Sequence, residues 1–314
     1  MRKTCLDMVY ELAKTDPRVV FIGSDLSPGL LDEMKQEFPD RHYMEGVMEQ
    51  HIIGMAAGMA MDGHMPYVNT IATFITRRCY EQVAMDLCLH HLPVRLIANG
   101  GGVVYAPLGP THLAVEDFAI MRALPNMTVT AVSDAEEMKR LMRATLDWPH
   151  PIYIRLGKGG DPVVSDERHG FAIGKGIVLK PSEASDPILL ISCGVMTARA
   201  LEAAEALERE GHAVEVVHIH TIKPLDEALV LERAGRARAV FVIEEHTVIG
   251  GLGSAVIDLM CEKGGARLPP MRKLGLRDAF AKLYGSQDDI LADNGLSPDG
   301  IAASIRETLD SFPA

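Results

Sequence analysis

Residues 41–74, RHYMEGVMEQHIIGMAAGMAMDGHMPYVNTIATF, contain the segment that decides the fold. One carboxylate, Glu49, stands at the start of a run of small and apolar residues in which Gly54 and Gly58 are one helical turn apart. This pattern predicts a helix that begins at Glu49, buries most of its residues and lets another group approach its glycine face closely. The helix dipole favours an acid at this position in any protein. Glu49 is therefore a candidate catalytic residue, and other motifs in the sequence are needed to assign its role.

Composition bounds the kind of protein that the chain can be. Its 314 residues, 47% of them hydrophobic, are enough for two packed domains. A net charge of −12 argues against nucleic acid or an anionic membrane as the main partner and leaves only a local cationic pocket for a phosphate. The five cysteines are odd in number and lack Cys-x-x-Cys spacing, which disfavours a disulfide framework and a zinc site and favours a reducing cytoplasm. The apolar run at residues 52–61 is about half the length of a membrane span.

Short apolar runs alternate with longer amphipathic ones, as in α/β proteins with a parallel sheet. Strands are predicted first at residues 19–23, 94–98, 128–132 and 152–156, and then at 188–192, 213–219 and 239–243. The later strands alternate with helices predicted at residues 197–210 and 225–234. A polar stretch with many glycines and prolines separates the two groups and indicates a linker, with one candidate short strand at residues 175–179. We predict two doubly wound α/β domains, at residues 1–165 and 187–314, joined by a linker at 166–186.

Motifs in the first domain resemble the pyrimidine-binding domain of transketolase-family thiamin diphosphate enzymes. They are GVMEQH at residues 46–51 with the following helix, Thr73-Phe74, GPTH at 109–112 and RALPNM at 122–127. The second domain resembles the C-terminal domain of the same family through KPLD at residues 223–226, EEH at 244–246 and GGLGSA at 250–255. This last loop lacks the third glycine of a dinucleotide fingerprint and a phosphate-loop lysine, so we predict a tight turn there.

The resemblance implies that thiamin diphosphate is the cofactor and gives roles to particular residues. Glu49 would be catalytic and cofactor-binding, because it hydrogen-bonds the pyrimidine N1′ and so activates the thiazolium carbon. Phe74 would stack on the pyrimidine from a loop, with Tyr80 and Arg77 in the same cofactor-binding segment. His112 would face the reacting carbon and the substrate as a hydrogen-bond donor or proton shuttle. We expect Glu49 to be sheltered from water.

The resemblance also implies substrate-binding residues. Arg155, at the end of a predicted strand, would hold a substrate phosphate with its guanidinium fork. Ser24 and Asp25 follow the first strand, at the sheet edge where sites of open α/β folds lie.

Two positions depart from the family pattern, because Gly100 and Leu108 stand where transketolases carry a histidine and an acid. The expected donor pocket is more apolar and suits a different or unphosphorylated two-carbon donor or acceptor.

The metal-binding half of a thiamin diphosphate site is missing from the sequence. Family members hold the diphosphate through Mg²⁺ or another divalent cation bound by a Gly-Asp-Gly motif and a later Asn, and this chain has no Gly-Asp-Gly. We therefore expect no metal ligand in this chain and an N-terminal partner subunit that supplies the motif. The resemblance implies a heterotetramer of two such chains with two partners, acting on sugar substrates as a transketolase.

Other functions remain as alternatives. The β subunit of a 2-oxo acid dehydrogenase shares both domains, but its usual T-P-I-x-E and P-x-H-S segments are here EGVME at residues 45–49 and PTHL at 110–113. Deoxyxylulose-phosphate synthase shares the Glu-Gln-His string and is usually one long chain. A non-catalytic regulatory paralogue is disfavoured because Glu49, Phe74, His112 and Arg155 are retained together.

Overall fold

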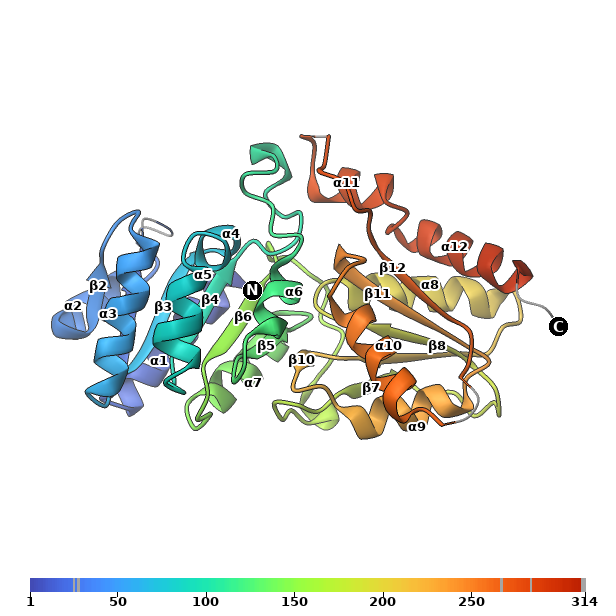
Figure 1. Ribbon diagram of the computed structural model, residues 1–314, viewed down its shortest axis with the longest axis horizontal. Helices are drawn as coiled ribbons and strands as arrows, with labels where there is room; N and C mark the ends of the chain where they lie inside the picture. Colours follow the sequence, from blue (N-terminus) through green and yellow to red (C-terminus); the bar gives the residue numbers. More distant parts are fainter. Residues whose placement is uncertain (25, 27–28, 266–267, 283, 312–314) are drawn as a thin grey trace.

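Two mixed α/β sheets lie next to each other in the computed structural model, which describes residues 1–24, 26, 29–265, 268–282 and 284–311 (Figure 1). The first sheet has the strand order β10-β5-β6-β4-β3-β1-β2, and the second has the order β12-β11-β8-β9-β7. Helices pack on both faces of the first sheet. The prediction of two α/β domains is confirmed. No helix in the described part of the chain combines the length and apolar character that a membrane span needs.

The first sheet is formed mainly by the N-terminal half of the chain. Its strands are β1 (Val19–Gly23), β2 (His42–Met44), β3 (Met65–Ile71), β4 (Arg95–Asn99), β5 (Thr128–Ala131) and β6 (Ile152–Leu156). Its helical segments are α1 (Arg2–Thr15), α2 (Asp32–Glu37), η1 (Pro39–Arg41), α3 (Glu49–Met61), α4 (Ala72–Thr76), α5 (Tyr80–Gln82), η2 (Val83–Cys88), η3 (Ala106–Leu108), α6 (Asp117–Ala123) and α7 (Ala135–Thr145). The strands β1 to β6 run parallel, so their carboxyl ends share one edge.

The second sheet is formed by the C-terminal half. Its strands are β7 (Ile177–Lys180), β8 (Ile188–Ser192), β9 (Val214–His218), β11 (Ala239–Thr247) and β12 (Met271–Leu276). The helical segments are η4 (Glu167–His169), α8 (Met196–Arg209), α9 (Glu227–Arg236), α10 (Leu252–Lys263), α11 (Gln287–Asp293) and α12 (Pro298–Ser311). Strand β7, which lies inside the predicted linker, pairs antiparallel with β9 as an edge of this sheet.

The two halves of the chain share structure across their boundary. Strand β10 (Thr221–Lys223) belongs to the C-terminal half but pairs antiparallel with β5 at the edge of the first sheet. One apolar core continues from α3 and β4 of the first half to β8 and α10 of the second. The halves are therefore held together by a strand pair and a common core.

Helix α3 begins at Glu49, as predicted. Its residues separate into a buried side and an open side. Ile52, Ile53 and three alanines are buried against the sheet, whereas Gly54 and Gly58 face outward. A methyl group added at Gly58 would meet no atom within 4 Å. The glycine face of α3 is thus open in this chain.

Candidate active site

The site is centred on a buried carboxylate that lies where the parallel strands of the first sheet end. The Glu49 side chain is 2% exposed at the first residue of α3. Thr70, near the end of β3, donates its hydroxyl to Glu49 Oε1 at 3.3 Å, and Ser24 in turn donates to Thr70 Oγ1 at 3.0 Å. The second carboxylate oxygen accepts a hydrogen bond from Arg78 Nη1 at 2.8 Å. Asp25, predicted beside Ser24, lies outside the described residues.

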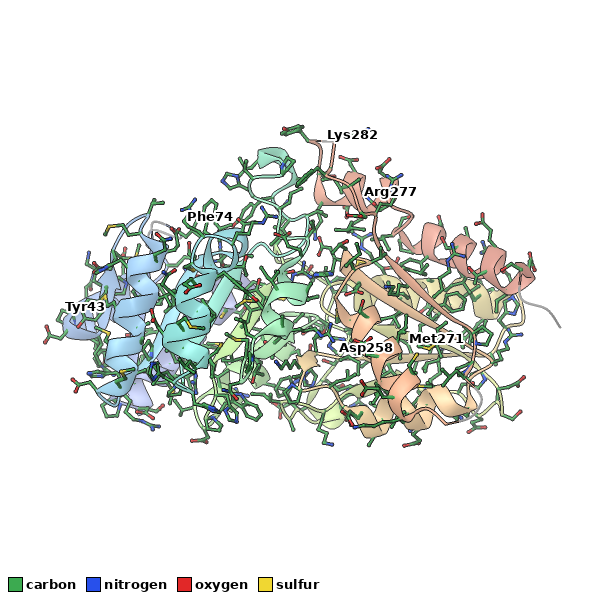
Figure 2. The ribbon with its side chains drawn as sticks, viewed as in Figure 1. Tyr43, Phe74, Asp258, Met271, Arg277 and Lys282 are labelled. Carbon is green, nitrogen blue, oxygen red and sulfur yellow. The ribbon has the colours of Figure 1, made fainter. Side chains whose placement is uncertain are left out.

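An aromatic surface lies next to the carboxylate. Phe74 belongs to the short helix α4, which corrects the prediction of a loop, because the chain turns directly from β3 into a helix at Ala72. The Arg78 guanidinium lies over the Phe74 ring with its central carbon 3.9 Å from the ring centroid. The His112 ring meets Phe74 edge-on at 5.3 Å between centroids. The fold thus brings Glu49, Phe74 and His112 into one cluster, and Figure 2 labels Phe74 at the upper edge of the first sheet.

Arg77 has different partners from Arg78 and holds the loop that carries His112. Its Nη2 donates to the carbonyl of Leu113 and to Glu116 Oε2, each at 2.8 Å. Burial opposes ionisation of Glu116, but the hydrogen bonds and charge of Arg77 outweigh it and hold the Glu116 pKa below its usual range. Arg77 therefore positions the GPTH loop, and its predicted contact with the cofactor stays a prediction.

Two further contacts shape the same region. The Tyr80 hydroxyl donates to the carbonyl of Ile120 at 2.9 Å and so ties α5 to α6. The Thr111 hydroxyl lies 2.9 Å from His112 Nδ1, within hydrogen-bond distance. Tyr80 thus supports the helices beside the site, and its predicted role in cofactor binding stays a prediction.

Arg155 lies inside the contact between the domains. Its side chain is 7% exposed, and its Nε is 3.0 Å from Asp117 Oδ2. Its Nη2 donates to the carbonyls of Glu245 at 2.8 Å and Ala114 at 3.2 Å. Burial raises the pKa of the Asp117 carboxyl, and the Arg155 charge acts against this effect. Two nitrogens of the guanidinium, Nε and Nη2, are engaged within the protein, and the predicted contact of Arg155 with a substrate phosphate stays a prediction. Lys158, two residues after β6, is exposed.

Gly100 cannot carry the histidine of the family pattern without a rearrangement. Its φ is +68°, a conformation that glycine adopts at little cost. A Cβ atom there would lie 2.2 Å from Cε2 of Tyr105. Leu108, the second departing position, is exposed in η3. Among the described residues, no group of three or more His, Cys, Asp or Glu side chains is placed to hold a metal ion.

Sequence reasoning missed two residues of this site, Arg78 and Thr70. A signal for Arg78 was available, because Phe74 and Arg78 are four residues apart, a spacing that puts side chains on the same face of a helical segment. Thr70 carried no such signal, since its contact with Glu49 depends on how β3 lies against α3.

Comparison with known proteins identifies the family. Two family models match, the pyrimidine binding domain of transketolase over residues 1–160 and the transketolase C-terminal domain over residues 176–301. The solved structure of a split gene transketolase, an inactive beta4 tetramer, matches with a TM-score of 0.88 and 35% identity over 98% of both chains.

Curated relatives agree with this assignment. The putative uncharacterized transketolase family protein y4mN of Sinorhizobium fredii is 39% identical over 302 residues, 95% of this chain and 86% of that protein. The 6-deoxy-6-sulfo-D-fructose transketolase subunit SqwH of Clostridium sp. is 33% identical over 312 residues, 99% of this chain and 94% of that one. The 1-deoxy-D-xylulose-5-phosphate synthase of Paraburkholderia phymatum is 38% identical over 96% of this chain, which spans 47% of that protein. The chain belongs to the transketolase family and contains its pyrimidine-binding and C-terminal domains.

Proposed function

We propose that this chain is the C-terminal subunit of a heteromeric, thiamin diphosphate-dependent transketolase that transfers a two-carbon ketol unit between sugar substrates. One observation carries the proposal: a single planar group, the Arg78 guanidinium, hydrogen-bonds Glu49 and also stacks on Phe74. The aminopyrimidine of the cofactor is likewise planar, and its ring nitrogen can share a proton with the Glu49 carboxyl group. The Glu49 carboxyl group and the Phe74 ring therefore fit the pyrimidine half of thiamin diphosphate.

The roles of the chain's own residues follow from their positions. When bound, thiamin diphosphate supplies the electron sink for breaking and forming a carbon–carbon bond next to a ketone. Glu49 would hold a proton on the ring nitrogen of the pyrimidine, in a place from which water is excluded. Phe74 would support the ring face. His112, in the loop positioned by Arg77, would donate a hydrogen bond or pass a proton at the substrate oxygen.

The surface around the site supports a partner chain. Large apolar side chains are exposed before α3, at its last residue, in η2 and just after it, namely Met44, Val47, Met48, Met61, Met85 and Leu89. Helix α3 and η2 pack against each other, and exposed apolar residues on neighbouring segments are expected at an interaction surface. A partner with a Gly-Asp-Gly motif and a later Asn would supply the Mg²⁺ and diphosphate half of the site. We propose that two such partners and two copies of this chain form the active heterotetramer.

The test is isolation of the native complex followed by reconstitution. We expect the chain to copurify in stoichiometric amount with a subunit that carries Gly-Asp-Gly, and the reconstituted complex to transfer a ketol unit. Replacing Glu49 with Gln should abolish transfer while leaving assembly unchanged, because the amide cannot take the proton role of the acid. Full transfer by the Glu49→Gln complex would refute the proposal.

A second candidate function is favoured by the relation to 1-deoxy-D-xylulose-5-phosphate synthase. The same reconstituted complex decides between the two functions. Formation of 1-deoxy-D-xylulose 5-phosphate, in place of ketol transfer between sugars, would establish the second function.

A further inference from the structure

Arg78 contacts both Glu49 and Phe74. Its guanidinium Nη1 is 2.8 Å from Glu49 Oε2, and its central carbon is 3.9 Å from the Phe74 ring centroid. A guanidinium is planar, delocalised and rich in N–H donors. The edge of the guanidinium contacts the carboxylate, and its face contacts the aromatic ring. In the proposed site, an aminopyrimidine would make the same two contacts.

The two partners in this contact are held very differently. Glu49 is 2% exposed and is oriented by the hydroxyl of Thr70, whereas the Arg78 side chain is 39% exposed. Within the described part of the chain, Glu49 is the one hydrogen-bonding partner of the Arg78 side chain. Arg78 follows α4 and precedes α5, in a short connection between helical segments. The carboxylate is fixed, and the arginine can leave by breaking one ion pair and one stacking contact with Phe74.

A second arginine in the chain shows what a purely structural pair looks like. Arg41 also lies over a phenylalanine, with its guanidinium carbon 3.9 Å from the ring centroid of Phe38. Its Nη1, however, donates to the backbone carbonyls of Ala13 at 2.9 Å and Asp16 at 3.2 Å, which ties α1 to the segment before β2. Arg78 makes no comparable backbone tie among the residues that the structure describes.

We propose that Arg78 is an internal ligand that fills the pyrimidine half-site of the cofactor-free chain and is displaced when the aminopyrimidine binds. The inference rests on the proposed function, because it assumes that Glu49 and Phe74 form the pyrimidine site. A buried carboxylate without a counter-charge is costly, so the arginine stabilises the site until the ligand arrives. The same contact competes with the ligand and lowers its apparent affinity by the fraction of molecules in which the site is open.

Because Arg78 competes with the ligand, its removal should increase the affinity of the chain for the ligand. If the Arg78 contact is populated about nine-tenths of the time, its loss tightens binding by about tenfold. Arg78→Met removes the charge and the hydrogen bond to Glu49 while keeping an unbranched side chain of similar length. Arg78→Lys keeps the charge but loses the planar face, and should fall between wild type and Arg78→Met.

The probe is 4-amino-5-hydroxymethyl-2-methylpyrimidine, which represents only the part of the cofactor that this chain contacts. Its binding to the full chain is measured by ligand-detected NMR for wild type, Arg78→Met, Arg78→Lys and the matched control Arg41→Met, after thermal unfolding shows that each variant is folded. We expect about tenfold tighter binding for Arg78→Met than for wild type. Arg41→Met should bind as wild type does.

A measurement on the wild-type chain keeps the test independent of variant stability. The Nε–H signals of Arg78 and Arg41 are followed by ¹⁵N NMR as the probe is added. Displacement predicts that the Arg78 signal shifts and exchanges faster with water, and that the Arg41 signal stays unchanged.

The outcomes separate the inference from the proposed function. Equal or weaker probe binding by Arg78→Met, or an Arg78 signal that is unchanged at saturating probe, would overturn the displacement of Arg78 and leave the pyrimidine site intact. Absence of binding in every variant would overturn both, because the opened site would then not accept the ring.

Discussion

His220 should make the folded protein lose stability in mildly acidic solution. It lies between β9 and β10, where the chain crosses from the second sheet to the first, and its side chain is fully buried. Its ring stacks on Phe171 with centroids 4.2 Å apart, and its Nδ1 lies 2.9 Å from the Thr221 hydroxyl. Burial lowers the His220 pKa to about 4, although the carboxylate of Glu137 acts in the opposite direction.

The sign and size of the effect follow from proton linkage. The folded protein has the lower pKa, so the unfolded chain takes up this proton first as the pH falls from 6.5 towards 4. The free energy of unfolding is unaffected above pH 6.5 and decreases below it. For a shift from 6.5 to about 4, the expected loss between about pH 7.5 and pH 5 is about 2 kcal/mol.

The assay is urea unfolding of the wild type and of His220→Asn at both pH values. Asparagine retains a polar atom near the Thr221 hydroxyl but cannot titrate, and it loses the ring stacked on Phe171. The variant is therefore less stable at both pH values, and the informative quantity is the change between them. The decrease in the free energy of unfolding from pH 7.5 to pH 5 should be about 2 kcal/mol smaller in the variant than in the wild type.

A matched control and a refuting result complete the test. His90 is exposed, so His90→Asn should leave the wild-type change between pH 7.5 and pH 5 in place. If His220→Asn loses as much stability between the two pH values as the wild type does, the argument that a buried neutral histidine controls this loss is wrong.

Two further substitutions test buried contacts elsewhere in the protein. Glu137→Gln should lower the free energy of unfolding at neutral pH by about 3 kcal/mol, because His218 Nε2, 2.9 Å away, holds the Glu137 pKa at about 2 against burial. This contribution is present above the unfolded pKa of 4.5 and disappears as the pH falls towards 2, so urea unfolding that shows the same deficit at low pH would contradict the assignment. Gly100→Ala should destabilise the chain by about 1–3 kcal/mol, since its φ of +68° and the nearby Tyr105 ring both exclude a side chain; an unchanged thermal midpoint would show that the loop rearranges freely.

Most strands could be predicted because they are short, continuous apolar runs. The predicted strands at residues 19–23, 152–156 and 188–192 have the bounds of β1, β6 and β8. Strand β3 went unpredicted because Asn69 and Thr70 interrupt its apolar pattern, although both are buried in the structure. Strand β10 has only three residues and is stabilised by pairing with β5, so its own sequence carries little signal.

The sequence by itself determined the family, the two α/β domains and the helix that begins at Glu49. These features depend on motifs and apolar periodicity among residues that are close together along the chain. The tertiary structure alone decided what several charged side chains do. Arg155 meets Asp117 and Glu245, which are far from it along the chain, and so becomes an interior residue. Arg78 meets Glu49 for the same reason. A charged side chain is defined by its partner and its exposure to water, and only folding sets both.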